Sequence, residues 1–307
     1  MTLRTTFVAA LCAFLGAPVW ALDLHPTRSS ATDLEVTGRL AGVTPGDARF
    51  VAWSDLRALP TRVLEMDGEF VSGKQLVTAL FLADLMKALP VKPGTDCFLA
   101  TCADGYASVF TSAFMARYRP FLVLEINGKG PKDWPPKGLA FNPGPYVITV
   151  STTLAPEFAT YRDSEHKRPW SVTTLEAASY AERFKAIYSG RWARLSASAQ
   201  DGREIWVNSC ASCHQGPAEV FGGTKAGRPF QAIQAYAGYD RMFFDKYVRD
   251  PKSIMACAQM EPHPHYGDAE LDGLAAFLTP ERQPSSTQAP GGPPLRKIGP
   301  SGGNSKG

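Results

Sequence analysis

One run of five residues carries the clearest chemistry in this sequence: Cys210-Ala211-Ser212-Cys213-His214. Two cysteines three positions apart present both sulfurs to one edge of a porphyrin, where they can bond its two vinyl groups as thioethers. The histidine directly after the second cysteine is then placed to bind the iron from one side. A bare Cys-x-x-Cys is ambiguous between zinc, a redox disulfide and haem, but the trailing histidine, without a second Cys-x-x-Cys pair, favours haem. The sequence therefore predicts one covalent haem c, with its iron, per chain.

A second iron ligand is expected from the segment 252–266, where Pro262 and Pro264 forbid a helix and fix an extended loop. Met260 lies just before these prolines, and its soft, neutral sulfur would fill the sixth position of the iron and raise the reduction potential. We therefore predict His214 and Met260 as the metal ligands. An open sixth position is one alternative, and three side chains of the same segment are others: Met255, His263 and His265.

The sequence around these residues has the pattern of three helices. The first begins near Ser198, which can act as its cap, and it delivers the first haem cysteine. The second covers about 243–250, and the last covers 268–278 with apolar residues at helical spacing on one face. Gly202 in the first helix and Phe277 in the last are predicted to let these two helices cross closely.

The segment from Ser198 to Leu278 resembles a small single-haem bacterial cytochrome c, on the capped helix, the Cys-x-x-Cys-His motif, the Met loop flanked by prolines and the final amphipathic helix. The resemblance covers about a quarter of the chain and implies an all-α fold. In that family the methionine before the last helix is the second axial ligand, and Met260 matches its place. The family usually has proline directly after this methionine, whereas Glu261 intervenes here.

The preceding part of the chain has an α+β pattern. Residues 78–89 are predicted to form a helix that Pro90 ends. Short apolar or alternating runs separated by Gly- and Pro-rich turns predict strands at 34–40, 96–101, 107–111, 121–126 and 146–150.

The order of these elements, with Trp53–Pro60 early and Ala103–Tyr106 later, is similar to the molybdopterin-binding domain of sulfite-oxidase-like proteins. In that family a cysteine from the loop before the corresponding helix binds molybdenum. Here the matching stretch, Glu65–Gln75, contains no cysteine. The resemblance therefore implies a mixed sheet with helices, and we expect this version to hold no cofactor and to act as a scaffold or partner surface.

The N-terminus has the three parts of a secretory signal: a positive charge at Arg4, an apolar run at 7–16 and a small-residue cleavage site that ends at Ala21. An uncleaved membrane anchor is the alternative. Export fits the haem motif, because thioether bonds to haem are made outside the bacterial cytoplasm. An oxidising compartment also permits a disulfide between Cys97 and Cys102, although positions five apart on one strand face opposite sides.

The predicted fold class is a two-domain protein, with an N-terminal α+β domain that resembles the sulfite-oxidase-like fold followed by an all-α cytochrome c domain. The expected organisation is a signal peptide at 1–21, the α+β domain at 22–151, a linking region at 152–196, the cytochrome c domain at 197–281 and a disordered tail at 282–307.

Composition narrows the function. The net charge of +3 gives no basic face for nucleic acid, and no segment of the mature chain has the length needed for membrane insertion. His25, His166 and the charged run 163–168 are interpreted as surface residues. We expect a periplasmic carrier of single electrons between redox proteins, one donor and one acceptor, rather than an enzyme. The alternative is a haem subunit that accepts electrons from a molybdopterin in the N-terminal domain.

Overall fold

The computed structural model describes residues 22–67, 73–135, 137, 139, 141–217 and 221–280. The predicted signal peptide and the predicted tail lie outside these residues. Within the described part of the chain, no helix has both the length and the apolar character needed to cross a bilayer.

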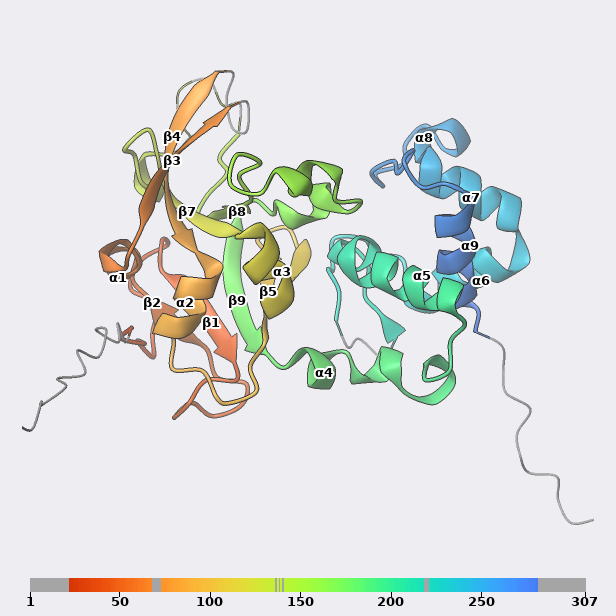
Figure 1. Ribbon diagram of the computed structural model, residues 1–307, viewed down its shortest axis with the longest axis horizontal. Helices are drawn as coiled ribbons and strands as arrows, with labels where there is room; N and C mark the ends of the chain where they lie inside the picture. The colour runs from red at the N-terminus through yellow and green to blue at the C-terminus, as the bar shows by residue number, and fades with distance from the viewer. Residues whose placement is uncertain are drawn as a thin grey trace, which may run out of the picture.

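Two β-sheets form the N-terminal part of the structure (Figure 1). The first sheet has the order β2-β1-β9-β5-β6, and only the β1–β9 pair is parallel. Its strands are β1 (Leu34–Gly38), β2 (Arg49–Val51), β5 (Cys97–Cys102), β6 (Ala107–Thr111) and β9 (Val172–Ala178). The second sheet is antiparallel with the order β3-β4-β7-β8. Its strands are β3 (Arg62–Asp67), β4 (Lys74–Phe81), β7 (Phe121–Ile126) and β8 (Val147–Thr149).

Short helices connect the strands, and longer helices follow them. The connecting α-helices are α1 (Trp53–Ala58), α2 (Leu82–Ala88), α3 (Ser112–Tyr118) and α4 (Tyr180–Arg183). The later ones are α5 (Ala197–Asn208), α6 (Phe230–Tyr239), α7 (Arg241–Arg249), α8 (Pro251–Ile254) and α9 (Asp268–Leu278). The 3₁₀ turns are η1 (Pro131–Asp133), η2 (Pro156–Thr160), η3 (Ser164–Lys167), η4 (Lys185–Tyr188), η5 (Gly190–Trp192) and η6 (Cys210–Ser212).

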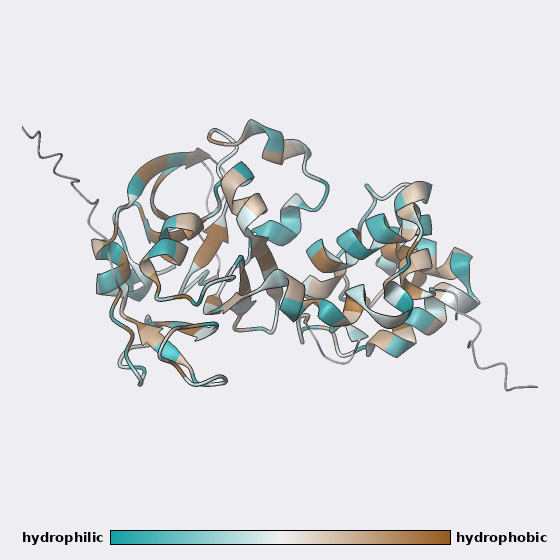
Figure 2. Ribbon diagram, turned by 60° about the horizontal axis from the view of Figure 1, so that its bottom comes forward, coloured by the Kyte–Doolittle hydropathy of each residue, from teal (hydrophilic) through white to brown (hydrophobic). Residues whose placement is uncertain are grey.

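Strand β5 is buried on both faces. Phe98 and Ala100 belong to a core that also holds residues of β1, β9 and α2. Cys97 and Leu99 point the other way and share a second core with Trp206 and other residues of α5, α6, α7 and α9. Because successive strand residues face opposite sides, a strand packed on both faces becomes an unbroken apolar run. Figure 2 shows brown, apolar strands at the centre, whereas the helices alternate between brown and teal.

The fold class expected from the sequence is wrong. The described residues form a mixed α/β structure with two sheets, nine strands and nine α-helices, and no separate all-α cytochrome domain is evident. The physical reason is the second core. Helices α5–α9 gather at one side of the molecule (Figure 1), but α5 also contacts β6, and Leu99, Val109 and Ala178 of the five-stranded sheet share one apolar core with residues of α5, α6, α7 and α9.

The helix predicted at 78–89 is half strand. Residues up to Phe81 complete β4, which pairs with β3 and β7, and only Leu82–Ala88 is helical. A short apolar run is compatible with both a helix and a strand, because its residues fit either periodicity. Here pairing with two neighbouring strands makes the first part a strand. In contrast, the strands 107–111 and 121–126 and the helix 268–278 are confirmed residue for residue.

Helix α5 begins one residue earlier than expected, and Ser196 rather than Ser198 caps it, since the Ser196 hydroxyl accepts a hydrogen bond of 3.2 Å from the Ala199 amide. The predicted close crossing with the last helix exists, but the partner of Gly202 is Gly273, not Phe277. A Cβ on Gly202 would collide with the Gly273 carbonyl, and a Cβ on Gly273 would lie 2.6 Å from the Ser198 carbonyl oxygen.

This crossing generates a stability prediction. Gly202→Ala should lower the free energy of unfolding by about 1–3 kcal/mol, because the methyl group forces two helix backbones apart in a packed core. Urea unfolding followed by circular dichroism measures the change. Ser198→Ala, an exposed position on the same helix, is the control and should change stability by less than about 0.5 kcal/mol. Equal stability of Gly202→Ala and the control would contradict the close crossing.

Candidate functional site

The predicted haem cysteines lie on a tight turn directly after α5. The helix ends at Asn208 with Ser209 as its C-cap, and η6 begins at Cys210. The amides of Cys213 and His214 both donate to the Cys210 carbonyl, at 3.2 and 2.9 Å. This turn holds the three candidate side chains close together, so their relative placement follows from the local backbone.

Both cysteines carry free, neutral thiols. Cys210 and Cys213 form no disulfide, and each is partly exposed. Burial raises the pKa of Cys210 to about 12, with Asp163 adding to the effect, and burial also raises the pKa of Cys213. Cys97 and Cys102 are free and buried on β5, so the disulfide considered between them is absent.

His214 stands at the end of this turn beside the indole of Trp206, with 6.3 Å between the ring centroids. Burial lowers the pKa of His214, while a backbone hydrogen bond with Arg228 acts in the opposite direction. Its Nδ1 is buried, and no other described residue forms a hydrogen bond with it. The ring is therefore neutral near pH 7, the state in which an imidazole binds a metal.

The predicted second-ligand loop faces this turn. Residues 255–267 contain no helix or strand, in agreement with the two prolines. Met260 is partly buried and packs against the same core as Cys210. Two electrostatic interactions also link the loop to the turn. Glu261 of the loop contributes to the raised pKa of Cys213, and His214 of the turn contributes to the lowered pKa of His263.

The alternatives to Met260 differ in their burial. The Met255 side chain is 43% exposed, and His265 is exposed as well. His263 is only 5% exposed, and burial lowers its pKa to about 4. The structure therefore places His263 near His214 and Met260 against the core that also contacts Cys210, and it leaves the other two candidates at the surface.

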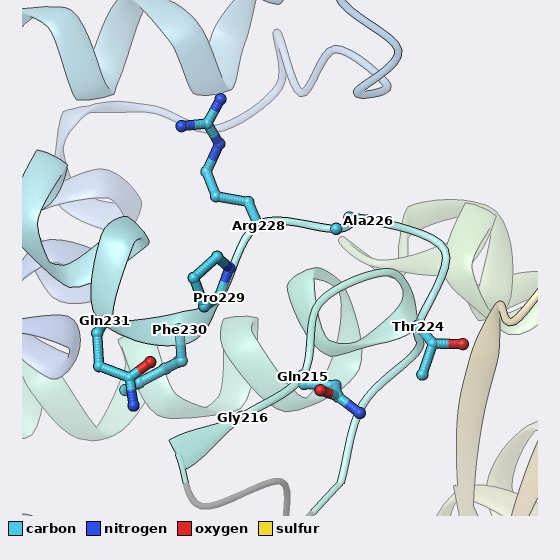
Figure 3. Close-up of a pocket in the computed structure, with 9 residues that line it drawn as sticks. Gln215, Gly216, Thr224, Ala226, Arg228, Pro229, Phe230 and Gln231 are labelled. Atoms are coloured by element: carbon cyan, nitrogen blue, oxygen red, sulfur yellow. The ribbon is translucent and has the colours of Figure 1, made fainter.

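A cavity of about 400 Å³ is lined by Gln215, the residue after His214, and by residues of the segment that follows the turn. Figure 3 shows the segment from Thr224 to Gln231 curving around it, with Gln215 and Gly216 on the opposite side and the Arg228 side chain directed away from Gln215. Phe230 also belongs to the apolar core, so the cavity has a polar rim and one apolar wall.

The turn between β5 and β6 packs directly on residues 223–225. We call these residues the haem-attachment loop because they follow the turn with the predicted haem cysteines. The Thr224 amide donates to the Gly105 carbonyl at 2.8 Å, and Lys225 forms an ion pair with Asp104 at 2.8 Å. A Cβ on Gly223 would lie 2.7 Å from the Gly105 carbonyl oxygen. Glycine is needed at this contact because two backbones approach each other without space for a side chain.

The charged run at 163–168, interpreted from the sequence as surface, contains two buried charged residues. Asp163 is 2% exposed and Lys167 is 1% exposed. The Tyr266 hydroxyl donates to Asp163 Oδ1 at 2.7 Å. His166 is half-buried, its Nδ1 lies 2.8 Å from the Tyr106 hydroxyl, and burial lowers its pKa to about 3. Sequence reasoning missed these residues, although the Lys167 position between apolar strands offers a weak signal.

These features fit a covalent haem. Two free thiols and a neutral histidine with an unpartnered buried nitrogen lie on one turn, and Met260 packs against the same apolar core as Cys210. Among the residues that the structure describes, no three His, Cys, Asp or Glu side chains gather as a metal site of their own. No protein-family model matches this chain, and neither does any curated protein sequence.

Lys167 gives a pH-dependent prediction. Its Nζ donates to the Val109 carbonyl at 2.7 Å, and burial lowers its pKa from 10.5 to about 7. The unfolded chain therefore takes up a proton at higher pH than the folded chain, so stability falls as the pH drops from about 10.5 to 7 and is unaffected by this group below that.

Lys167→Met should remove this dependence. Relative to the variant, the wild type should gain on the order of a few kcal/mol in free energy of unfolding between pH 7 and pH 10, since one pKa unit corresponds to about 1.36 kcal/mol. Urea titrations across this range measure the difference. Lys246→Met, at an exposed position of α7, is the matched control. Parallel pH profiles for wild type and Lys167→Met would contradict a buried, neutralised lysine.

Proposed function

We propose that this protein is an exported c-type cytochrome that carries single electrons between periplasmic redox partners. Cys210 and Cys213 hold the haem through thioether bonds, and His214 and Met260 bind its iron. One observation supports the proposal: the proline-bounded loop that carries Met260 lies near the turn with the free thiols and the imidazole, although the loop is some fifty residues away in the sequence.

Each residue has a chemical part. When bound, the haem supplies one-electron exchange at its iron. The two thioether bonds keep the group attached in both oxidation states. His214 supplies a neutral imidazole nitrogen, and Met260 supplies a soft sulfur that favours the reduced state and closes the sixth position to small ligands. Trp206 and Phe230 exclude water from this side of the site, since both belong to the buried core.

A second candidate function is favoured by the contact between the β5–β6 turn and the haem-attachment loop. In this candidate the N-terminal part binds a molybdopterin, and electrons pass from it to the haem. The Gly105 carbonyl accepts a hydrogen bond from Thr224 and the Asp104 carboxylate pairs with Lys225, so the two parts of the chain touch shortly after the predicted haem cysteines. About one molybdenum atom per purified chain would favour this candidate over the simple carrier.

The first test of the proposal is haem attachment. The wild type, produced in a host with a c-type haem maturation system, should retain haem after denaturation and extraction with acidified acetone. Cys210→Ala together with Cys213→Ala should abolish this retention, because both thioether bonds are lost. Cys257→Ala, an exposed cysteine outside the motif, is the control and should retain haem. Haem that leaves the wild type with the solvent would refute the proposal.

The second test concerns the sixth ligand. Met260→Ala should keep the haem attached, lower the reduction potential and let carbon monoxide bind promptly to the reduced protein, because the sulfur no longer competes for the iron. Redox titration and absorption spectra provide both measurements. Met255→Ala, which alters an exposed methionine of the same segment, should behave like the wild type. An unchanged spectrum for Met260→Ala would assign the ligand to His263 instead.

A further inference from the structure

The loop that carries Met260 has no secondary structure of its own, so its distance from the haem-attachment turn depends on tertiary contacts. Helix α7 supplies two of them. The His263 amide donates to the Val248 carbonyl at 3.0 Å, and Arg249 Nε donates to the Tyr266 carbonyl at 2.9 Å. Both contacts hold the backbone of the loop, and neither fixes the side chains that face His214.

The side chains of the loop are held from the other side of the site, by residues that precede α5 by more than thirty positions. Tyr266 is 1% exposed, and its hydroxyl donates to the buried Asp163 carboxylate. The His263 ring lies between two rings, with Tyr266 at 5.2 Å and His166 at 5.3 Å between centroids. Tyr106, directly before β6, in turn contacts His166.

The Asp163 contact is the strongest of these. A hydrogen bond to a charged acceptor contributes roughly twice as much as a neutral one, and a buried carboxylate that loses its donor bears a large desolvation cost. Burial raises the pKa of Asp163, and Arg162, which lies 3.6 Å from the same carboxylate, acts in the opposite direction. Tyr266 shares an apolar core with Cys210 of the attachment turn, and Cys210 also influences the pKa of Tyr266, which burial raises.

We propose that Asp163 and His166 are positioning residues for the sixth ligand, because they fix Tyr266 and His263 and thereby hold the Met260 loop against the haem-attachment turn. This inference rests on the proposed function. Residues of the N-terminal part of the chain would then help to determine which side chain binds the iron. The part before α5 is then an element of the electron-transfer site rather than only a scaffold.

The experiment measures how strongly Met260 is held, through the affinity of the ferric protein for added imidazole, which competes for the sixth position. Asp163→Ala should bind imidazole about tenfold more tightly than the wild type and weaken the near-infrared charge-transfer band of methionine-ligated ferric haem. Asp163→Asn, whose amide oxygen still accepts from Tyr266, should restore wild-type affinity to within about threefold. These ratios correspond to roughly 1.4 and 0.7 kcal/mol.

Tyr266→Phe removes one oxygen and leaves the ring in place, so it provides the same readout if Asp163→Ala folds poorly. Tyr180→Phe is the matched control, because it also removes a buried hydroxyl with a hydrogen bond, to Tyr188 at 3.1 Å, away from the Met260 loop. Unchanged imidazole affinity in haem-loaded Asp163→Ala and Tyr266→Phe would overturn this inference and leave the proposed function standing. A wild type without covalent haem would overturn both.

Discussion

The burial of one sheet on both faces is the constraint on which the rest of this structure depends. Alternate residues of β5 and β6 enter two different cores, one shared with α2 and β1 and the other with α5 and α9. The helices therefore cannot leave the sheet without exposing apolar surface on both partners. The same packing fixes the turn between β5 and β6 against the haem-attachment loop, where Gly105 and Gly223 bring two backbones together.

Local patterns predicted most individual elements of this fold but not its class. The strand at 107–111 and the helix at 268–278 follow from short-range periodicity, which depends on neighbouring residues alone. The expectation of an all-α unit was wrong because an amphipathic helix has the same sequence whether its apolar face packs on helices or on a sheet. The helix prediction for residues 78–81 was wrong for a related reason, since only pairing with β3 and β7 makes this segment a strand.

The residues of the candidate site also fall into two groups, those that local sequence predicts and those that only the fold reveals. Cys210, Cys213 and His214 could be found from the sequence because their geometry is set within five residues, and the Met260 loop could be found because two prolines mark it. Asp163 and Lys167 could not, since a run of charged residues usually lies in water. Their burial depends on Tyr266 and on the Val109 carbonyl, which are distant in sequence and close only after folding.

The buried groups of the site share one electrostatic property. Burial raises the pKa of the Cys210 thiol and lowers the pKa of His214 and His263, so each is kept neutral near pH 7. Formal charges stand around them instead, in the Lys225–Asp104 pair and at Arg162 and Asp163. Under the proposed function, a unit change of charge at the iron would interact more strongly with the largely buried Arg162–Asp163 pair than with the half-exposed Lys225–Asp104 pair, because solvent screens exposed charges. The part of the chain before α5 supplies both members of the less screened pair.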